Sequence, residues 1–333
     1  MKITLFGTQP YDRESFDRIR DAYGFDVTYH HSHLNAGNVA LAEGADVVCI
    51  FVNDTADAAT VARLSQLGVR LIALRCAGFN NVDLLSAAQH GIPVVRVPAY
   101  SPHAVAEHAV ALMLSLNRKI HRAYWRTRDG NFSLHGLLGF DLYGKTAGIV
   151  GTGRIARELI RILRGFGMEV IAYDLCPDEA YAAAAGIAYV PLDELYARAD
   201  IVSLHCPLTD RTRYMIGPEA IGRMKPGVML INTGRGQLIH TGALIDGLKQ
   251  KKIGAAGLDV YEEEAAYFYE DTSDRIMSDD VLARLLSFNN VIVTSHQGFF
   301  TREALDNIAR TTMENIREFA AGEPLTNRVS AGA

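Results

Sequence analysis

The feature that most constrains this sequence is a long series of short apolar runs separated by amphipathic stretches of helical periodicity. The runs lack the strict apolar–polar alternation that is typical of a sheet with one solvated face. Such strands are buried on both faces, which indicates parallel sheets covered by helices. The chain has 333 residues, enough for roughly two units at about 150 residues each.

Two series of strands are expected. In the first hundred residues the strands are 3–6, 47–51, 71–74 and 94–97, with helices at 15–23, 56–67 and 84–90. After a long helix at 102–118, the second series is 146–150, 169–173, 201–204, 228–232, 255–258 and 291–294. Six strands are what a full dinucleotide-binding sheet needs. A last helix at 303–321 is expected to return to the first unit, which makes that unit discontinuous.

A glycine-rich turn stands between the strand 146–150 and the helix that follows it. Its sequence is Gly151-Thr152-Gly153-Arg154-Ile155-Ala156, a G-x-G-x-x-A pattern. The first glycine allows a tight turn and the second lets a pyrophosphate approach the backbone at the helix N-terminus. The motif is weak alone, but it lies in the required strand–turn–helix context.

Asp174 directly follows the next expected strand, eighteen residues beyond Ala156. A carboxylate at this position accepts hydrogen bonds from the ribose hydroxyls of an adenosine and repels a 2′-phosphate. The sequence therefore predicts NAD, rather than NADP, as the cofactor.

Three chemically complementary side chains follow three later strands: Arg235, Glu264 and His296. Each alone has an ordinary explanation, as a helix cap, a solvated acid or a structural histidine. Ligands bind at the carboxyl ends of strands in open parallel sheets, so together the three predict a catalytic site.

Several ordered segments together resemble one enzyme family. They are Arg75-Cys76-Ala77-Gly78-Phe79-Asn80-Asn81-Val82-Asp83, Val97-Pro98-Ala99-Tyr100-Ser101-Pro102, Ala106-Glu107-His108-Ala109, the 151–156 turn, His205-Cys206-Pro207-Leu208-Thr209, Asn232-Thr233-Gly234-Arg235-Gly236, Gly257-Leu258-Asp259-Val260-Tyr261-Glu262 and His296. Over its full length the chain resembles the D-isomer-specific 2-hydroxyacid dehydrogenases, and within them the lactate-forming bacterial group. Ala156, Gly234 and Ser295 depart from the usual pattern without removing a group that the chemistry needs.

The resemblance implies an α/β fold of two doubly wound parallel-sheet domains. A Rossmann NAD-binding domain, residues 101–299, is inserted in a flavodoxin-like substrate-binding domain, residues 1–100 plus 300–333. Arg235 is expected to bind the carboxylate and carbonyl of a 2-oxo acid, because its planar guanidinium matches that geometry. His296 is expected to be the acid–base group, with Glu264 stabilising its protonated form.

The family's binding residues carry over onto matching positions of this chain. The expected substrate contacts are the backbone N–H groups of Ala77 and Gly78, the Tyr100 hydroxyl, and the side-chain walls Phe51 and Phe299. The expected cofactor contacts are Gly151, Gly153, Arg154, Ile155, Asp174, Cys206, Pro207, Thr212, Thr233, Gly234 and Asp259.

The activity that the resemblance implies is the reduction of pyruvate to D-lactate by NADH, in fermentation. Another 2-oxo acid, such as glyoxylate, hydroxypyruvate or phenylpyruvate, is the alternative. A second alternative comes from a different class, because NADH-sensing corepressors share this fold and similar site residues. Turnover of NADH with pyruvate separates them, since a binding module has a negligible rate.

Composition excludes several other classes. The net charge of −5 without a basic cluster argues against nucleic-acid and anionic-membrane partners. No apolar run reaches the ~18 residues of a membrane span. Four scattered cysteines without paired spacing indicate reduced thiols in a cytoplasmic protein.

Three remaining patterns concern metal binding, subunit contacts and a loop. His30, His31 and His33 lie close in sequence, but no metal is expected. The helix at 104–116 is apolar on too many faces for a solvated helix, which predicts burial between subunits of a homodimer or homotetramer, with His103 and His108 at a subunit or domain contact. The acidic, aromatic segment 262–280, with Tyr267, Phe268 and Tyr269, is expected to be a packed loop.

Overall fold

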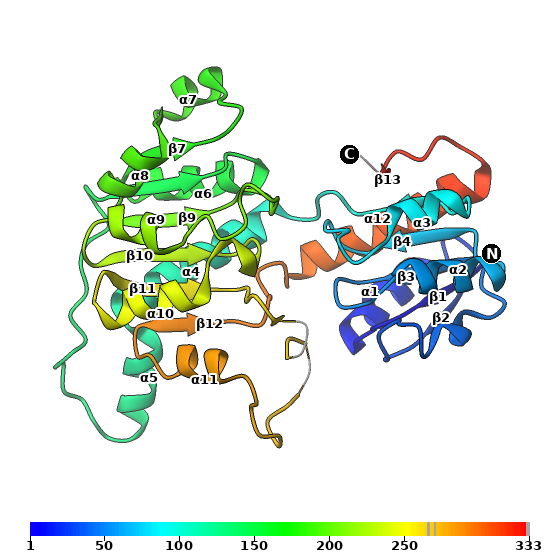
Figure 1. The fold of residues 1–333 in the computed structure, drawn as a ribbon, viewed down its shortest axis with the longest axis horizontal. Helices are drawn as coiled ribbons and strands as arrows, with labels where there is room; N and C mark the ends of the chain where they lie inside the picture. Colours follow the sequence, from blue (N-terminus) through cyan, green and yellow to red (C-terminus); the bar gives the residue numbers. More distant parts are fainter. Residues whose placement is uncertain (265–266, 270, 331–333) are drawn as a thin grey trace. The chain divides into compact units, whose positions relative to one another are not determined.

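The structure is a computed structural model that describes residues 1–264, 267–269 and 271–330 (Figure 1). It divides into two compact units. Unit 1 contains Met1–Ser101 and the segment from Phe299 onward, and unit 2 contains Pro102–Gly298.

Unit 1 is built on a six-stranded sheet with the order β13-β5-β4-β3-β1-β2. Its strands are β1 (Lys2–Leu5), β2 (Asp26–Tyr29), β3 (Val47–Ile50), β4 (Leu71–Leu74), β5 (Val94–Val95) and β13 (Arg328–Val329). The pairs among β1 to β5 are parallel, and β13 pairs antiparallel with β5. Because β2 and β3 flank β1, the chain winds outward in both directions from β1, as in flavodoxin-like folds.

Helices cover both faces of this sheet. Helices α1 (Pro10–Arg20) and α12 (Arg302–Ala321) pack on one face, where Phe16 and Met313 share a buried cluster with Ile3 and Val47. Helices α2 (Ala58–Gln66) and α3 (Leu84–Gln89) and the 3-10 helix η1 (Val39–Ala42) share a second cluster with the other face. The expected return of the last helix to the first unit is confirmed.

Unit 2 is built on a seven-stranded parallel sheet with the order β12-β11-β10-β9-β6-β7-β8. Its strands are β6 (Thr146–Val150), β7 (Glu169–Tyr173), β8 (Ala188–Tyr189), β9 (Ile201–Leu204), β10 (Val228–Asn232), β11 (Ile253–Leu258) and β12 (Val291–Val293). This is the Rossmann order, because successive strands are added to one side of β6 up to β8 and to the other side from β9 onward.

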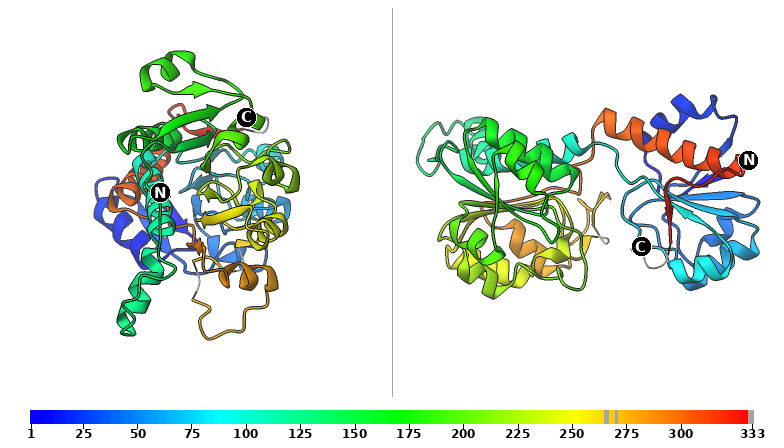
Figure 2. Two further views of the ribbon diagram at one scale, coloured as in Figure 1. Left: turned by 90° about the vertical axis from the view of Figure 1, so that its left-hand side faces the viewer. Right: turned by 90° about the horizontal axis from the view of Figure 1, so that it is seen from above.

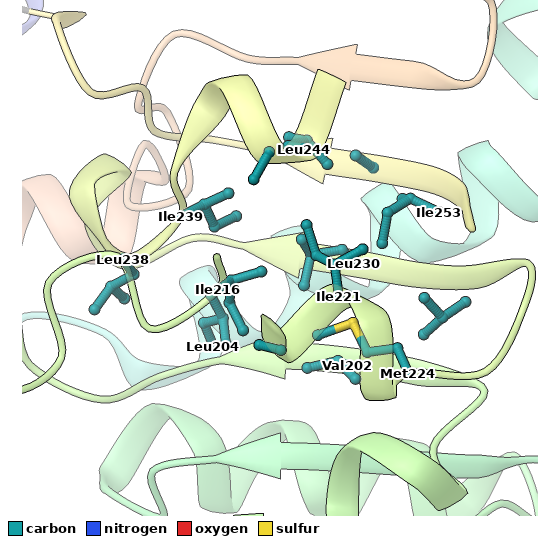
Figure 3. Packing of buried hydrophobic residues seen from close by; sticks show 14 of the residues in the cluster. Val202, Leu204, Ile216, Ile221, Met224, Leu230, Leu238, Ile239, Leu244 and Ile253 are labelled. Atoms are coloured by element: carbon teal, nitrogen blue, oxygen red, sulfur yellow. The ribbon is translucent and has the colours of Figure 1, made fainter. Parts of the chain in front are cut away.

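The helices of unit 2 also lie on both faces of its sheet, as Figure 2 shows. On one face pack α4 (Pro102–Arg118) and α6 (Arg154–Gly165), and on the other α8 (Leu192–Arg198), α9 (Pro218–Arg223), α10 (Thr241–Lys249) and α11 (Asp280–Leu286). The described residues of unit 2 also form α5 (Ile120–Arg128), α7 (Glu179–Ala185) and the 3-10 helix η2 (Gly236–Leu238). Figure 3 shows the core of the second face, where Leu204, Leu230, Ile221 and Leu244 pack together.

The structure corrects the sequence prediction in two respects. Strands β2, β8 and β13 were not expected. Each is an edge strand of its sheet, where a strand buries less apolar surface and leaves a weaker sequence pattern. The helix predicted to be buried between subunits is instead covered inside unit 2. Its residues Ala109, Leu112 and Met113 belong to the buried cluster between α4 and one face of the sheet.

None of the helices in the described ranges is long and apolar enough to span a bilayer.

Candidate active site

The turn between β6 and α6 has the geometry that the glycine motif predicts. Gly151 has φ +89°, a left-handed conformation, and a Cβ there would lie 2.7 Å from the backbone nitrogen of Cys206. Gly153 is the N-cap of α6, and a Cβ built on it would meet nothing within 4 Å. Arg154 is exposed at the helix start and Ile155 is half-buried. The backbone is therefore open to a ligand at a helix N-terminus.

Asp174 lies directly after β7 and faces this turn. Its Oδ2 accepts hydrogen bonds from the Thr152 backbone N–H (2.7 Å) and hydroxyl (2.8 Å), and its Oδ1 accepts one from Cys176 N–H (2.9 Å). Partial burial opposes ionisation, but these hydrogen bonds outweigh it and lower the pKa of Asp174. An ionised acceptor therefore stands where a ribose of a dinucleotide is expected.

The other predicted cofactor residues follow β9 and β10. Cys206 is half-buried, Pro207 is exposed, and the Pro207 carbonyl accepts a hydrogen bond from the Thr212 hydroxyl (2.7 Å). The Gly234 N–H donates to the Asn232 side chain (3.0 Å). The buried hydroxyl of Thr233 has no hydrogen-bond partner among the described residues. This orphaned hydroxyl and the open backbone at Gly153 both fit a bound dinucleotide.

His296 and Glu264 form a close pair at the carboxyl end of the sheet. Nδ1 of His296 lies 2.9 Å from Oε1 of Glu264, and Oε2 of Glu264 accepts a hydrogen bond from Tyr261 N–H (3.1 Å). Both side chains are mostly buried, at 17% and 20% exposed. The acidic run 262–264 is therefore not simply solvated, because its last member is directed at the histidine. The pair can hold a proton on the imidazole and orient its Nε2 outward.

Arg235 follows β10, the strand next to β11 in the sheet. Its backbone is extended, and its Nη1 donates a hydrogen bond to the Gly234 carbonyl (2.7 Å). The Arg235 carbonyl accepts one from the Asn232 side chain (2.9 Å). Asn232 thus holds the loop that presents a half-buried guanidinium.

Asp259 organises the turn that carries His296. Its carboxylate accepts hydrogen bonds from the Thr294 hydroxyl (2.5 Å), Gln297 N–H (2.9 Å) and Gly298 N–H (2.8 Å), and its carbonyl accepts one from His296 N–H (2.8 Å). His296 has φ +51°, a conformation that costs a non-glycine residue about 1–3 kcal/mol and persists only where its surroundings hold it. Burial opposes ionisation of Asp259, but hydrogen bonds from His108, Thr294 and Gly298 outweigh it and lower its pKa.

Two residues of this cluster were not assigned to a site from the sequence. Tyr269 donates a hydrogen bond to the His296 carbonyl (3.0 Å), and its ring stacks on the imidazole at 6.2 Å between centroids. His108 of α4, predicted at a subunit or domain contact, lies within unit 2 with Nε2 3.2 Å from Asp259 Oδ1. The sequence does indicate that His108 faces the protein interior. It shares a helix face with Ala104 and Leu112, four residues before and after it, and both are buried.

His103 keeps a different environment from His108. Its side chain is exposed, and its Nδ1 lies 3.2 Å from Glu158 of α6. In the described part of the chain no group of three or more His, Cys, Asp or Glu side chains could hold a metal ion.

Unit 1 holds the five residues predicted to contact the substrate. Phe299 packs against Phe51 (5.9 Å between centroids) and Tyr100 (6.1 Å), so these three form one aromatic cluster. Ala77 and Gly78 lie in the loop after β4, where the Ala77 carbonyl accepts a hydrogen bond from the Arg96 side chain (2.9 Å). Their roles remain predictions.

The buried Arg75 supports this part of unit 1, a role that the sequence motif containing it does not predict. Its Nη2 donates to the Gly7 carbonyl (2.7 Å), and its Nε lies 3.5 Å from Oδ1 of Asp12. Its guanidinium lies 4.9 Å from the centre of the Phe51 ring. A charged group therefore backs the aromatic cluster from the protein interior.

The sheet order, the glycine turn and the acceptor at Asp174 define a dinucleotide-binding protein of the Rossmann class. A family model described as "D-isomer specific 2-hydroxyacid dehydrogenase, NAD binding domain" matches residues 110–298. The chain belongs to the D-isomer-specific 2-hydroxyacid dehydrogenase family, and it is an NAD-dependent oxidoreductase. The predicted fold class, family and cofactor are confirmed.

Relatives and solved structures agree with this family. The chain is 51% identical to a 2-hydroxyacid dehydrogenase homolog of Haemophilus influenzae (99% of each chain) and 47% identical to the D-lactate dehydrogenase of Escherichia coli (99% of this chain, 100% of the relative). The apo-structure of D-lactate dehydrogenase from Escherichia coli has a TM-score of 0.91 at 46% identity, over 99% of this chain and 100% of that one. The pyruvate reductase of Chlamydomonas reinhardtii has a TM-score of 0.93 at 47% identity, over 98% of each chain.

Proposed function

We propose that this protein is an NAD-dependent D-lactate dehydrogenase, which reduces pyruvate to D-lactate and also catalyses the reverse reaction. The observation that carries the proposal is the 2.9 Å contact between His296 and Glu264 at the end of a Rossmann sheet. Similarity over nearly the whole chain to the Escherichia coli D-lactate dehydrogenase and to the Chlamydomonas reinhardtii pyruvate reductase supports pyruvate as the substrate.

Each group of the site has a role in this reaction. NADH, when bound, supplies the hydride that adds to the carbonyl carbon of pyruvate. His296 donates the proton that the carbonyl oxygen gains, and it takes that proton back in the oxidation of D-lactate. Glu264 stabilises the imidazolium form before the transfer, and Arg235 binds the substrate carboxylate through its guanidinium.

The remaining predicted residues bind cofactor and substrate. Those proposed to hold NAD are Gly151, Gly153, Arg154, Ile155, Asp174, Cys206, Pro207, Thr212, Thr233, Gly234 and Asp259. Those proposed to hold the substrate from unit 1 are Ala77, Gly78, Tyr100, Phe51 and Phe299. On this assignment unit 1 is the substrate-binding domain of the enzyme.

The test is steady-state oxidation of NADH with a panel of 2-oxo acids, followed by chiral analysis of the product. Pyruvate should have the highest kcat/KM and give D-lactate.

Arg235→Lys keeps the positive charge but loses the paired hydrogen bonds of the guanidinium. KM for pyruvate should therefore rise at least about tenfold and kcat should fall, while NADH binding stays nearly unchanged.

Other outcomes of the same panel decide between the alternatives. A preference for glyoxylate, hydroxypyruvate or phenylpyruvate would assign the enzyme another 2-oxo acid. Negligible turnover with every acid, together with tight NADH binding, would indicate an NADH-sensing binding module.

We also propose that the protein is a homo-oligomer, with a homodimer as the minimum. The segment after α4 exposes large apolar side chains, with Trp125 at 66%, Leu134 at 82% and Leu138 at 89% exposed. Such a patch is typical of a surface that a second copy covers. Light scattering should give at least twice the chain mass, and Leu134→Asp with Leu138→Asp should lower it to one chain.

We place the protein in the cytoplasm, in the fermentative reoxidation of NADH. Cys49, Cys176 and Cys206 are free thiols, as in a reducing compartment. Fractionation of cells should recover the NADH–pyruvate activity with cytoplasmic markers.

A further inference from the structure

His108 reaches the Asp259 cluster from a helix that the mechanism does not otherwise use. Its Nε2 lies 3.2 Å from Asp259 Oδ1 and 3.1 Å from the Thr294 hydroxyl oxygen. A carboxylate cannot donate, and the short contact between Thr294 and Asp259 (2.5 Å) takes the hydroxyl proton. Nε2 of His108 therefore carries a proton and donates it toward this pair.

Asp259 in turn fixes the turn that carries His296. Its carboxylate binds the N–H groups of Gln297 and Gly298, the two residues after the histidine. Because φ at His296 is +51°, these two hydrogen bonds help to hold a backbone shape that is costly for a non-glycine residue. A rotation of the carboxylate would break both of them and weaken the support of the turn that carries the imidazole.

We propose that His108 is a positioning residue for His296. By donating to Asp259 it locks the carboxylate in the rotamer that holds the left-handed turn, and the turn keeps the imidazole on Glu264. The inference rests on the proposed role of His296 as the proton donor. It assigns to α4 a part in the chemistry, in addition to its place in the core.

The consequence of losing the donor follows from burial. Asp259 is 1% exposed and His108 16% exposed, so little water is available to replace a missing donor. The carboxylate would then sample other rotamers. A misplaced proton donor lowers kcat, whereas KM for pyruvate depends mainly on Arg235 and should change little.

Two variants distinguish the loss of the hydrogen-bond donor at residue 108 from a change in side-chain volume. His108→Gln places an amide N–H near the position of Nε2, and His108→Met fills similar space without a donor. We expect kcat for pyruvate reduction to fall between about tenfold and about 100-fold in His108→Met, with KM within about threefold of wild type. In His108→Gln kcat should stay within about threefold. His103→Met, on the exposed face of the same helix, is the matched control and should leave kcat unchanged.

Hydrogen–deuterium exchange gives a readout that does not need turnover. Peptides that contain the amides of Gln297 and Gly298 should exchange faster in His108→Met and at the wild-type rate in His108→Gln. If wild type does not reduce pyruvate, the proposed function fails, while the exchange data still decide whether His108 holds the turn.

A double-mutant cycle tests whether the effect passes through His296. In a His296→Gln background, His108→Met should cause no further loss of kcat, because both changes act on the same proton transfer. Full additivity of the two losses would overturn the proposal.

Three further results would also overturn it. These are equal impairment of the Gln and Met variants, an effect confined to the dissociation constant of NADH, and unchanged exchange of the 294–298 segment in His108→Met. If His108→Met does not fold, Thr294→Val removes the other side-chain donor to Asp259 at nearly constant shape. That variant should show the same pattern of faster exchange and lower kcat at constant KM.

Discussion

At the scale of single residues, the position of one imidazole depends on several groups that are distant in sequence. His296 is held at Nδ1 by Glu264, at its N–H by the Asp259 carbonyl and at its own carbonyl by Tyr269. Because these hydrogen bonds fix both ring and backbone, the charge of Glu264 can be removed without removing the histidine. That separation makes the acid–base role testable.

Glu264→Gln should lower kcat for pyruvate reduction. The amide can still accept a hydrogen bond from His296 but carries no charge, so it stabilises the imidazolium that donates the proton less. The loss should be about tenfold if the charge is worth ~1.4 kcal/mol. Steady-state kinetics with pyruvate measure it.

His296→Gln is the companion variant. It should lower kcat by at least about 10²-fold while NADH still binds. An unchanged kcat in Glu264→Gln, with His296→Gln still active, would mean that the pair is misassigned.

Asp174→Ala should weaken NADH binding and raise the NADPH/NADH ratio of kcat/KM. The change removes the acceptor for the ribose hydroxyls and the charge that repels a 2′-phosphate. Titration of the two cofactors by fluorescence, together with kinetics, measures both effects. An unchanged cofactor ratio would show that another residue sets the preference.

At the scale of elements, the turn from β6 to α6 joins the first strand of the Rossmann sheet to the helix that receives the pyrophosphate. Glycine is required at its two positions for different physical reasons. Gly151 is needed for the fold itself, because its φ is +89° and Cys206 lies against it. Gly153 has ordinary backbone angles and open space, so its lack of a side chain serves a ligand.

Gly151→Ala should therefore lower the free energy of unfolding by about 1–3 kcal/mol and weaken NADH binding. Gly153→Ala should keep wild-type stability and weaken only NADH binding, because its Cβ would stand in the path of the pyrophosphate. Denaturant unfolding and NADH titration of both variants provide the comparison. Equal stability of the two variants would contradict this distinction.

At the scale of the whole molecule, stability depends on groups that no reaction step uses. His205 follows β9 beside the glycine turn, with its Nε2 2.8 Å from the Ser203 hydroxyl. Burial lowers the pKa of His205 from 6.5 to about 4. Between these two values the unfolded chain binds a proton that the folded chain does not.

The free energy of unfolding should therefore fall as pH drops from about 6.5 to about 4, by up to about 3 kcal/mol from this residue, and no further below that. His205→Gln should lose less stability than wild type over this window. Denaturant unfolding at pH values near 7 and near 4.5, at constant salt, measures the difference. Parallel losses in the two proteins would contradict the assignment.

Much of this molecule was predictable because its central strands are buried on both faces. Burial requires continuous apolar runs, so β4, β6, β7, β9 and β10 were expected with the bounds that the structure shows. The glycine turn and Asp174 were also predictable from the sequence, because backbone geometry and charge restrict those positions to few residue types. The family and the cofactor followed from these local patterns, whereas the roles of Arg235, Glu264 and His296 remain predictions.

The sequence by itself determined the two doubly wound sheets and the strand ends at which chemistry is expected. Only the tertiary structure decided that α4 is covered inside its own unit, that His108 reaches Asp259, and that Tyr269 lies on His296. The physical reason is that the periodicity of a helix shows which face is buried but not what covers it. A loop residue such as Tyr269 has no periodicity at all, so its partner is set by contacts between segments that lie far apart in the sequence.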